Sequence, residues 1–146
     1  MNEIVCSGAL FYAINTKRFL FLHRATGKQN NVWGLVGGTN ENTETPLEAL
    51  QREITEEIGN VNVKKIIPLE TFISNDNHFL FYTFLNIVSK EFTPDLNHEH
   101  NGYAWVSLGC WPNPLHHGLK NTLRNKINQA KLETIIKLIT LTDMYE

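Results

Sequence analysis

The sequence predicts a mixed α/β fold, one sheet with helices packed on it, as a single domain of residues 1–146. At this length, with 42% apolar and 19% charged residues, the chain is long enough for one hydrophobic core and too short for two. Segments rich in β-branched and aromatic residues alternate with helical segments in the order strands, helix, strands, helix. This order favours a mixed sheet over a regular alternation of parallel strands and helices.

The N-terminal strands are indicated by short apolar segments between polar turns. Residues 4–14, "IVCSGALFYAI", and residues 18–24, "RFLFLHR", are separated by a polar turn and therefore predict a β-hairpin. Residues 32–38, "VWGLVGG", predict a further short strand that ends in the paired glycines Gly37 and Gly38.

The rest of the chain predicts a second pair of strands, one more strand and a helical C-terminal third. Residues 61–74 and 78–88 flank the polar turn "NDN", and residues 103–108, "YAWVSL", form the further strand. Leucine and isoleucine recur at helical spacing over residues 119–139. Part of that region, residues 132–141, is also compatible with a strand.

Composition narrows the class of protein. A net charge of −2 gives no electrostatic reason to expect nucleic-acid binding. Cys6 and Cys110 have no CxxC partner and form no disulfide framework. Glu3 stands where a signal peptide would carry a basic residue, and no stretch reaches the length of a membrane-spanning helix. We therefore expect a cytoplasmic protein without membrane association.

The end signals of one helix are strong. Thr45 followed by Pro46, with Glu48 three residues after the threonine, is a capping box with proline at the first helical position. Gly59 stands where a helix commonly ends in a left-handed residue. The sequence therefore predicts a helix over residues 46–58.

Acidic residues are concentrated on and just before this helix: six of the twelve glutamates of the chain lie within residues 41–57. At about 100° per residue, Glu53, Glu56 and Glu57 share an arc of roughly 100°. The arc borders the stripe predicted to face the core, which contains Leu47, Leu50, Ile54 and Ile58.

A solvated acidic face explains this cluster poorly. Like charges three or four residues apart cost roughly 0.2–0.5 kcal/mol each, and the helix dipole disfavours anions near the C-terminus. Arg52 offers only one positive charge against three carboxylates. A divalent cation with oxygen ligands, Mg²⁺ or Mn²⁺, would neutralise the cluster and is typically shared with substrate phosphates. The cluster therefore predicts a metal site.

The box at residues 38–60, which begins "GTNENTETPLEALQREITEEIG", resembles the signature of the Nudix hydrolases. The positions in register are Gly38, Glu44, Arg52, Glu53, Ile54, Glu56, Glu57 and Gly59. Two positions depart from the family pattern. Val36 stands where proline is common, which affects loop stiffness, and Asn60 replaces an apolar residue after the last glycine. We expect Val61 to take over the apolar contact that Asn60 cannot make.

The resemblance implies an α/β/α sandwich with a mixed sheet and metal-dependent cleavage of a nucleoside diphosphate linked to another group. It implies that Glu53, Glu56 and Glu57 bind the metal, with Gly38 allowing close backbone approach and offering its carbonyl. It also implies that Arg52 orients Glu53.

The resemblance leaves the catalytic base open between Glu53 and a carboxylate from another loop. Glu99 lies about where members of the family supply such a carboxylate, although a plain polar loop is the alternative. A zinc site at the His-Glu-His segment, residues 98–100, is disfavoured. No additional ligand of suitable spacing is visible, and the helical HExxH arrangement is absent. Glu44 is expected to hold the loop before the helix rather than to bind metal.

Substrate contacts are less strongly indicated. Arg24 and Lys28 could bind substrate phosphates, although surface cations need no function. Trp33, Phe79 and Tyr103 could stack on a base, but aromatic residues in strands are usually core.

The box does not specify the substrate. Family frequency favours ADP-sugars or dinucleoside polyphosphates over nucleoside triphosphates. Two alternatives stay open: a module that senses a nucleotide without cleaving it, and an RNA 5′ pyrophosphohydrolase, which the absence of a concentrated basic patch disfavours. A small-molecule nucleotide is thus the expected partner, and the resemblance is compatible with a homodimer.

Overall fold

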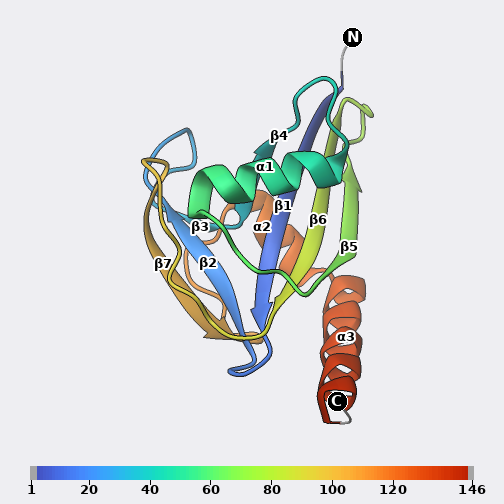
Figure 1. Ribbon diagram of the computed structural model, residues 1–146. Helices are drawn as coiled ribbons and strands as arrows, with labels where there is room; N and C mark the ends of the chain where they lie inside the picture. Colours follow the sequence, from blue (N-terminus) through green and yellow to red (C-terminus); the bar gives the residue numbers. More distant parts are fainter. Residues whose placement is uncertain (1–2, 145–146) are drawn as a thin grey trace.

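The computed structural model describes residues 3–144, so residues 1–2 and 145–146 of the predicted domain lie outside the described residues. The described chain forms a mixed sheet of seven strands and three helices (Figure 1). The elements in chain order are β1 (Ile4–Ala13), β2 (Arg18–Arg24), β3 (Trp33–Gly34), β4 (Val36–Thr39), α1 (Pro46–Ile58), β5 (Lys65–Ile73), β6 (Phe79–Val88), β7 (His100–Ser107), α2 (His117–Arg124) and α3 (Lys126–Met144).

Strand β1 organises the sheet. It pairs in parallel with β6 along its whole length. Its other edge is shared by two antiparallel strands: β4 pairs with the first half, Cys6 to Ala9, and β2 with the last residues, Phe11 to Ala13. Strand β5 lies outside β6, and β7 pairs with β2. Because β4 takes one half of the β1 edge, the paired glycines lie beside the middle of the sheet.

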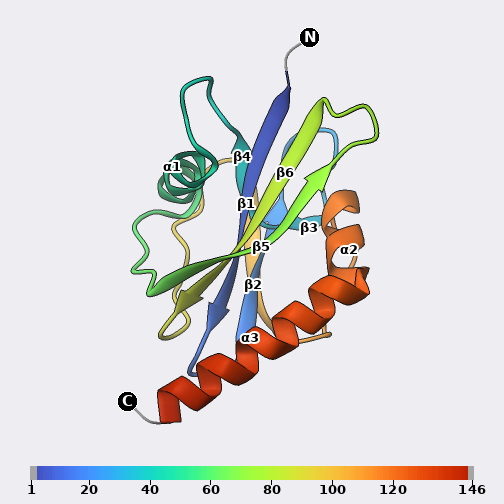
Figure 2. The same ribbon diagram turned by 90° about the vertical axis from the view of Figure 1, so that its right-hand side faces the viewer.

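The sheet is covered by helices on both faces. Helix α1 lies on one face, and α2 and α3 lie on the other (Figure 2). Alternation along β1 supplies both cores: Phe11 belongs to the cluster with Leu50 of α1, whereas Tyr12 belongs to the cluster with Leu119 and Leu132 of α2 and α3. The predicted α/β/α sandwich with a mixed sheet is confirmed. No helix among residues 3–144 is both long and apolar enough to cross a membrane.

Helix α1 has the predicted bounds. The Thr45 side chain accepts a hydrogen bond from the Glu48 N–H at 3.2 Å, and the Glu48 carboxylate accepts one from the Thr45 N–H at 3.0 Å. Gly59 ends the helix with φ +87°, which favours glycine, but its ψ of −162° leads the chain away extended rather than in the left-handed helical region. One residue of the predicted core stripe was wrong, since Leu47 is 42% exposed. It lies in the first turn of the helix.

The structure corrects one further prediction and decides another that the sequence left open. The segment predicted as one short strand is divided at Leu35, so that β3 pairs with β2 and β4 pairs with β1. The C-terminal segment is the helix α3, and the strand alternative for residues 132–141 is wrong. Its apolar side, which includes Leu132, packs on the sheet.

Candidate active site

The three glutamates at the C-terminal end of α1 differ widely in burial. Glu57 is 2% exposed, the side chain of Glu53 is 12% exposed, and that of Glu56 is 56% exposed. The acidic arc therefore runs from solvent into the protein instead of lying along its surface. Glu57 stands within the apolar side of the helix, between Ile54 and Ile58.

Arg52 connects the helix to the loop before it. Its guanidinium donates two hydrogen bonds to the Glu44 carboxylate, at 2.7 and 3.0 Å, and one to the Thr39 carbonyl at 3.1 Å. Its remaining nitrogen lies 3.0 Å from Glu53 and 3.3 Å from Glu56. The bond from Arg52 lowers the pKa of Glu44, and the same bond is the main cause of the raised pKa of Arg52. Glu44 thus holds the loop, as expected, and Arg52 lies where it can orient Glu53.

The glycines of β4 let the acidic side chains approach the backbone. The Gly37 N–H donates to Glu57 Oε2 at 3.0 Å. A Cβ on Gly38 would lie 2.5 Å from Glu53 Oε1, so the missing side chain of Gly38 provides the space that the Glu53 carboxylate occupies. A Cβ on Gly37 would collide with the Ser7 carbonyl of β1. Both glycines are therefore required by close approach.

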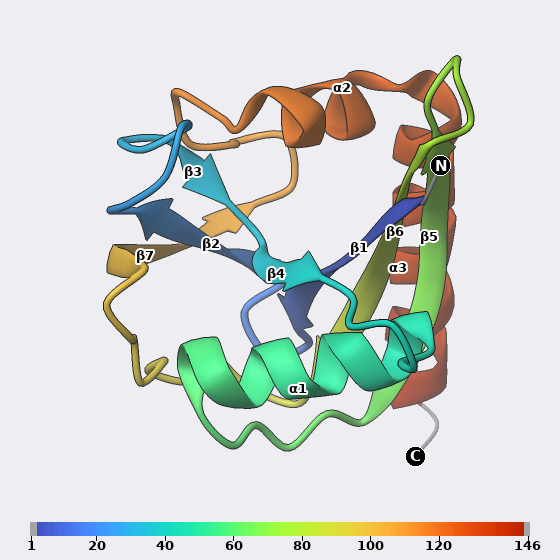
Figure 3. The same cartoon turned by 90° about the horizontal axis from the view of Figure 1, so that it is seen from above.

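Glu99 reaches the same place from the loop before β7. This loop runs past the C-terminal end of α1 (Figure 3) and is bonded to it. The Asp95 and Asn97 N–H groups donate to the Ile58 and Glu57 carbonyls, and the Asn97 side chain donates to the Glu56 carbonyl at 3.1 Å. The Asn97 side-chain oxygen in turn accepts from the Glu99 N–H at 3.0 Å. These bonds satisfy the carbonyls that a helix end leaves free and fix the position of Glu99.

Glu57, Glu99 and His100 each offer one ligand atom, and these atoms all lie within 4.8 Å of one another. His100 is buried at the start of β7, with Nδ1 3.6 Å from Glu57 Oε1. That nitrogen has no hydrogen-bond partner among the residues that the structure describes.

Without an ion, the buried pair is neutral. Burial raises the pKa of Glu57 to about 10, helped by a hydrogen bond and like charge from Glu53 and by the charge of Glu99. Burial lowers the pKa of His100 to about 4. Both shifts favour uncharged forms at neutral pH, so the 3.6 Å contact between them is not a salt bridge. An arrangement that makes a carboxylate this hard to ionise would be relieved by a cation.

The residues present fit a divalent cation. Two carboxylates and an unpartnered imidazole nitrogen converge, and Glu53 lies against Glu57. Oxygen ligands suit Mg²⁺, and a nitrogen among them is also tolerated by Mn²⁺ and other transition metals. Glu56, by contrast, is largely exposed and bonded to Arg52.

A small polar cavity of about 60 Å³ adjoins this cluster. Its lining includes Glu57, Glu99 and His100 together with Arg24, at the end of β2, and Gly37. The volume suits an ion and a few waters rather than a nucleotide. Of the two cations predicted to bind substrate phosphates, Arg24 therefore lies at the site, whereas Lys28 is exposed in the loop between β2 and β3 and is not among the described residues that line the cavity.

Of the three aromatic residues considered as base-stacking candidates, two pack against other side chains and one is exposed. Trp33 packs on the core beneath α2 and α3, and its ring lies 5.0 Å from that of His23. Phe79 makes an edge-on contact with Phe72 and a tilted contact with Phe81, and Tyr103 is exposed on β7.

Sequence reasoning missed three residues of this site: Gly37, Asn97 and His100. His100 was considered only within a zinc site, but its place two positions before the apolar strand segment Gly102–Val106 could have suggested an inward side chain. Gly37 and Asn97 act through hydrogen bonds to α1 from segments far away in the sequence, so no local sequence pattern predicts them.

Comparisons with known proteins agree with the fold. The family model described as NUDIX domain matches residues 6–125. The chain therefore belongs to the Nudix family. The sequence matches none of the curated proteins with which it was compared.

Solved structures share the fold at low sequence identity. A MutT NUDIX hydrolase from Burkholderia pseudomallei is 24% identical, with a TM-score of 0.65 over 84% of this chain and 97% of the other. The NUDIX domain of Shewanella oneidensis NrtR, complexed with ADP ribose, is 16% identical, with a TM-score of 0.68 over 92% and 90%. A MutT/nudix family protein from Enterococcus faecalis is 19% identical, with a TM-score of 0.62 over 72% of this chain, which spans only 44% of that protein.

Proposed function

We propose that the protein hydrolyses the pyrophosphate of a nucleoside diphosphate linked to a second group, with a divalent cation, Mg²⁺ or Mn²⁺. Glu53 and Glu57 would bind the ion beside Glu99 and His100, and Glu56 would join them once its side chain leaves Arg52. The observation that carries this proposal is geometric: the buried Glu57 carboxylate is held by the Gly37 N–H, and its ligand atom lies within 4.8 Å of those of Glu99 and His100. Gly38 contributes its close backbone approach and its carbonyl.

The bound ion would neutralise pyrophosphate oxygens and activate a water molecule. The chain's own groups would do the positioning. The Gly37 N–H holds one oxygen of Glu57, and Arg52 holds Glu53 through a 3.0 Å contact. Arg24, beside the cluster, would contact a substrate phosphate, and Lys28 could do so only through movement of its loop.

Glu99 is the base that we favour for deprotonating the attacking water. It is exposed, so its carboxylate can reach solvent, and Asn97 fixes its backbone beside Glu57. Glu53 is the alternative, but its carboxylate is already held by Arg52 at 3.0 Å.

An ADP-sugar or a dinucleoside polyphosphate is the substrate class that we propose ahead of nucleoside triphosphates. The NUDIX domain of Shewanella oneidensis NrtR was solved with ADP ribose, which supports this order, although the shared property at 16% identity is the fold.

The experiment is a hydrolysis assay of the purified protein with Mg²⁺ and a panel of ADP-ribose, diadenosine tetraphosphate and ATP, in which released mononucleotide is measured. We expect turnover of at least one of the first two. Glu57→Gln should lower it on the order of a thousandfold, because a bound metal contributes several kcal/mol to transition-state stabilisation. The fold should persist in circular dichroism, since the amide oxygen can still accept from Gly37.

The matched control is Glu48→Gln. Glu48 lies on the same helix, and glutamine can make the same capping bond, so activity should be unchanged. Tight binding of ADP-ribose with no product from any panel member would contradict hydrolysis and favour a nucleotide sensor. Release of pyrophosphate from 5′-triphosphorylated RNA alone would favour the RNA alternative.

A further inference from the structure

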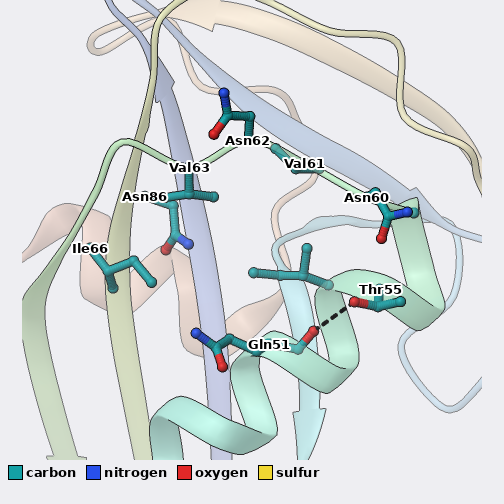
Figure 4. A pocket seen from close by; sticks show the side chains of 10 residues that line it. Gln51, Thr55, Asn60, Val61, Asn62, Val63, Ile66 and Asn86 are labelled. Carbon is teal, nitrogen blue, oxygen red and sulfur yellow. Dashed lines mark hydrogen bonds between the residues drawn. The ribbon is translucent and has the colours of Figure 1, made fainter.

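A second cavity, of about 380 Å³, lies between α1, the segment 59–64 that follows it, and strands β5 and β6 (Figure 4). Gln51 and Thr55 line it from the helix. At about 100° per residue, Gln51 points roughly 160° away from Glu53. The cavity is thus on the side of α1 away from the acidic cluster. Its volume is within the range of about 300–1,000 Å³ that small-molecule sites occupy.

Asn86 is the unusual residue of this cavity. It lies in β6 between Phe84 and Val88, which both pack in the core cluster under α1, and it is 0% exposed. Its side-chain amide has no hydrogen-bond partner, for either atom, within residues 3–144. Figure 4 shows the amide pointing into the space between Val63, Ile66 and Gln51. Because an unpaired buried amide costs free energy that an aliphatic side chain would not, this side chain calls for a partner.

The remaining lining supplies two kinds of surface. Three further amides, Gln51, Asn60 and Asn62, lie around the cavity, and its other side chains are mainly aliphatic: Ile54, Val61, Val63 and Ile66. No charged side chain of the described chain is among the lining residues. The cavity therefore suits a ligand that is flat, uncharged and able to form hydrogen bonds, and it offers nothing to a phosphate.

One residue that lines the cavity, Asn60, is also a position where the sequence departs from the family pattern. It is the position at which the box departs from the apolar residue of the family pattern, and here its side chain lines the cavity. Val61 packs against the core cluster beneath the helix, as the sequence led us to expect. The substitution thus adds an amide to the cavity while a neighbouring residue keeps the apolar contact.

We propose that this cavity binds a nucleobase, recognised by paired hydrogen bonds to the Asn86 amide. An asparagine side chain offers one donor and one acceptor in a plane, and it pairs with bases that present the complementary donor and acceptor side by side, as adenine does. Isoleucine and valine side chains would cover the faces of the ring. The Asn86 amide has no solvent-exposed surface, so entry requires a lining side chain to rotate, and the exposed Gln51 is long enough to do so.

Water is the alternative partner. One water occupies about 30 Å³ of liquid volume, so a cavity of about 380 Å³ far exceeds what one bridging water needs. The test must therefore separate a nucleobase from water, and from other flat carboxamides.

The experiment measures binding to the full chain by calorimetry, and by NMR shifts of the Asn86 side-chain amide. It is done with EDTA present, so that its result is independent of metal-dependent hydrolysis. The probes are adenine, cytosine, nicotinamide and N6,N6-dimethyladenine, which lacks the donor of adenine. We expect adenine or cytosine to bind and the dimethylated base to bind at least tenfold more weakly.

Two variants and one control test the residues. Asn86→Leu should weaken base binding at least tenfold, and Asn60→Leu, which restores an apolar residue at an exposed position, should weaken it about threefold with the fold intact. Asn121→Ala, an exposed asparagine of α2 on the opposite face of the sheet, should leave it unchanged.

Three results would overturn the proposal. Absence of binding by every probe at millimolar concentration would leave water as the partner. Equal binding to Asn86→Leu and to the unmodified protein would exclude the amide, and if that variant does not fold, equal binding to Asn60→Leu would exclude the cavity. Tighter binding of nicotinamide than of either base would assign the cavity to a different ligand.

Discussion

The two sides of helix α1 differ in charge: one carries the acidic cluster, and the other lines a cavity. On one side, Glu53, Glu56 and Glu57 crowd together, yet Arg52 and the Gly37 N–H provide contacts for each of them. On the other side the lining carries no charge within the described chain, yet Asn86 has no partner. Each side nevertheless contains a buried polar group without a hydrogen-bond partner among the described residues: His100 Nδ1 on the first side and the Asn86 amide on the second. The comparison teaches that unpaired buried atoms mark a candidate site better than the number of charges does.

The acidic side also depends on neighbours that are far apart in sequence. Glu44 precedes the helix, Gly37 lies in β4 and Glu99 precedes β7. The amide side is built almost entirely from α1, the segment after it and two adjacent strands. We therefore expect the acidic side to lose activity when one of these contacts is removed. The residues of the amide side should tolerate substitution with less effect on stability.

Among the residues that position the acidic cluster, removal of Arg52 should have the largest effect on activity. Arg52→Ala cuts the contacts to Glu44, Glu53 and Glu56 together, and we expect kcat/KM to fall on the order of a hundredfold, as for partners of metal ligands. The free energy of unfolding should fall by about 2–3 kcal/mol, measured by urea denaturation. Arg52→Lys should recover little, because lysine cannot form the forked contact to Glu44.

The control is Arg18→Ala, which breaks the more exposed pair with Glu91. It should change stability by less than about 1 kcal/mol and leave activity intact. Unchanged kcat/KM in Arg52→Ala would show that Glu53 needs no positioning by this residue.

The two glycines of β4 should separate stability from activity. Gly37→Ala places a methyl group against the Ser7 carbonyl, which is backbone, so we expect a loss of about 1–3 kcal/mol in the free energy of unfolding. For Gly38→Ala the three atoms nearest to the added methyl group all belong to the Glu53 carboxylate, a side-chain end that can swing away. It should keep its stability and lose metal affinity, as measured by Mn²⁺ titration. Equal stability loss in both variants would contradict this difference.

Two buried asparagines should respond with opposite sign. Asn86→Leu removes an unpaired amide and should raise the free energy of unfolding, without added ligand, by about 1 kcal/mol. Asn128 is equally buried, but its side chain donates to Glu70 at 2.6 Å and to the Thr122 carbonyl at 3.0 Å. Asn128→Leu should therefore lower the free energy of unfolding by about 1–3 kcal/mol. Destabilisation by both substitutions would mean that Asn86 is satisfied in solution.

The pH dependence of stability should follow the proton that the buried Glu57 carboxyl holds in the folded state. The folded protein raises the pKa of Glu57 to about 10 from its ordinary value of 4.5, so the folded state keeps a proton that the unfolded state releases. Stability from this group is therefore full below about pH 4.5 and falls as pH rises toward 10. We expect added Mg²⁺ to reduce this fall, because the ion takes the place of the proton. The measurement is thermal unfolding at several pH values with EDTA or Mg²⁺, and Glu57→Gln should abolish the difference.

Helix α1 could be predicted because its signals are local. A capping box and a terminal glycine act within a few residues, so the sequence alone specified the bounds Pro46–Ile58. The acidic arc followed from helical periodicity in the same way. The metal-site hypothesis thus needed only a segment of the chain.

The depth of each side chain could not be predicted in the same way. Periodicity gives the direction of Glu57 and Leu47, but the sheet decides that the first is covered and the second is not. His100 and Asn86 owe their positions to strand register between segments far apart in sequence. His100 follows a polar loop and Asn86 lies in an apolar strand, and neither local sequence indicates which side chains surround these two residues.

The bonds from Asp95 and Asn97 to the last turn of α1 have a dynamic consequence. A helix end normally frays, but here fraying would also release the loop that presents Glu99. Opening of the helix terminus and loss of the second carboxylate should therefore be one event, and the amide protons of residues 95 and 97 should exchange with deuterium at a common rate.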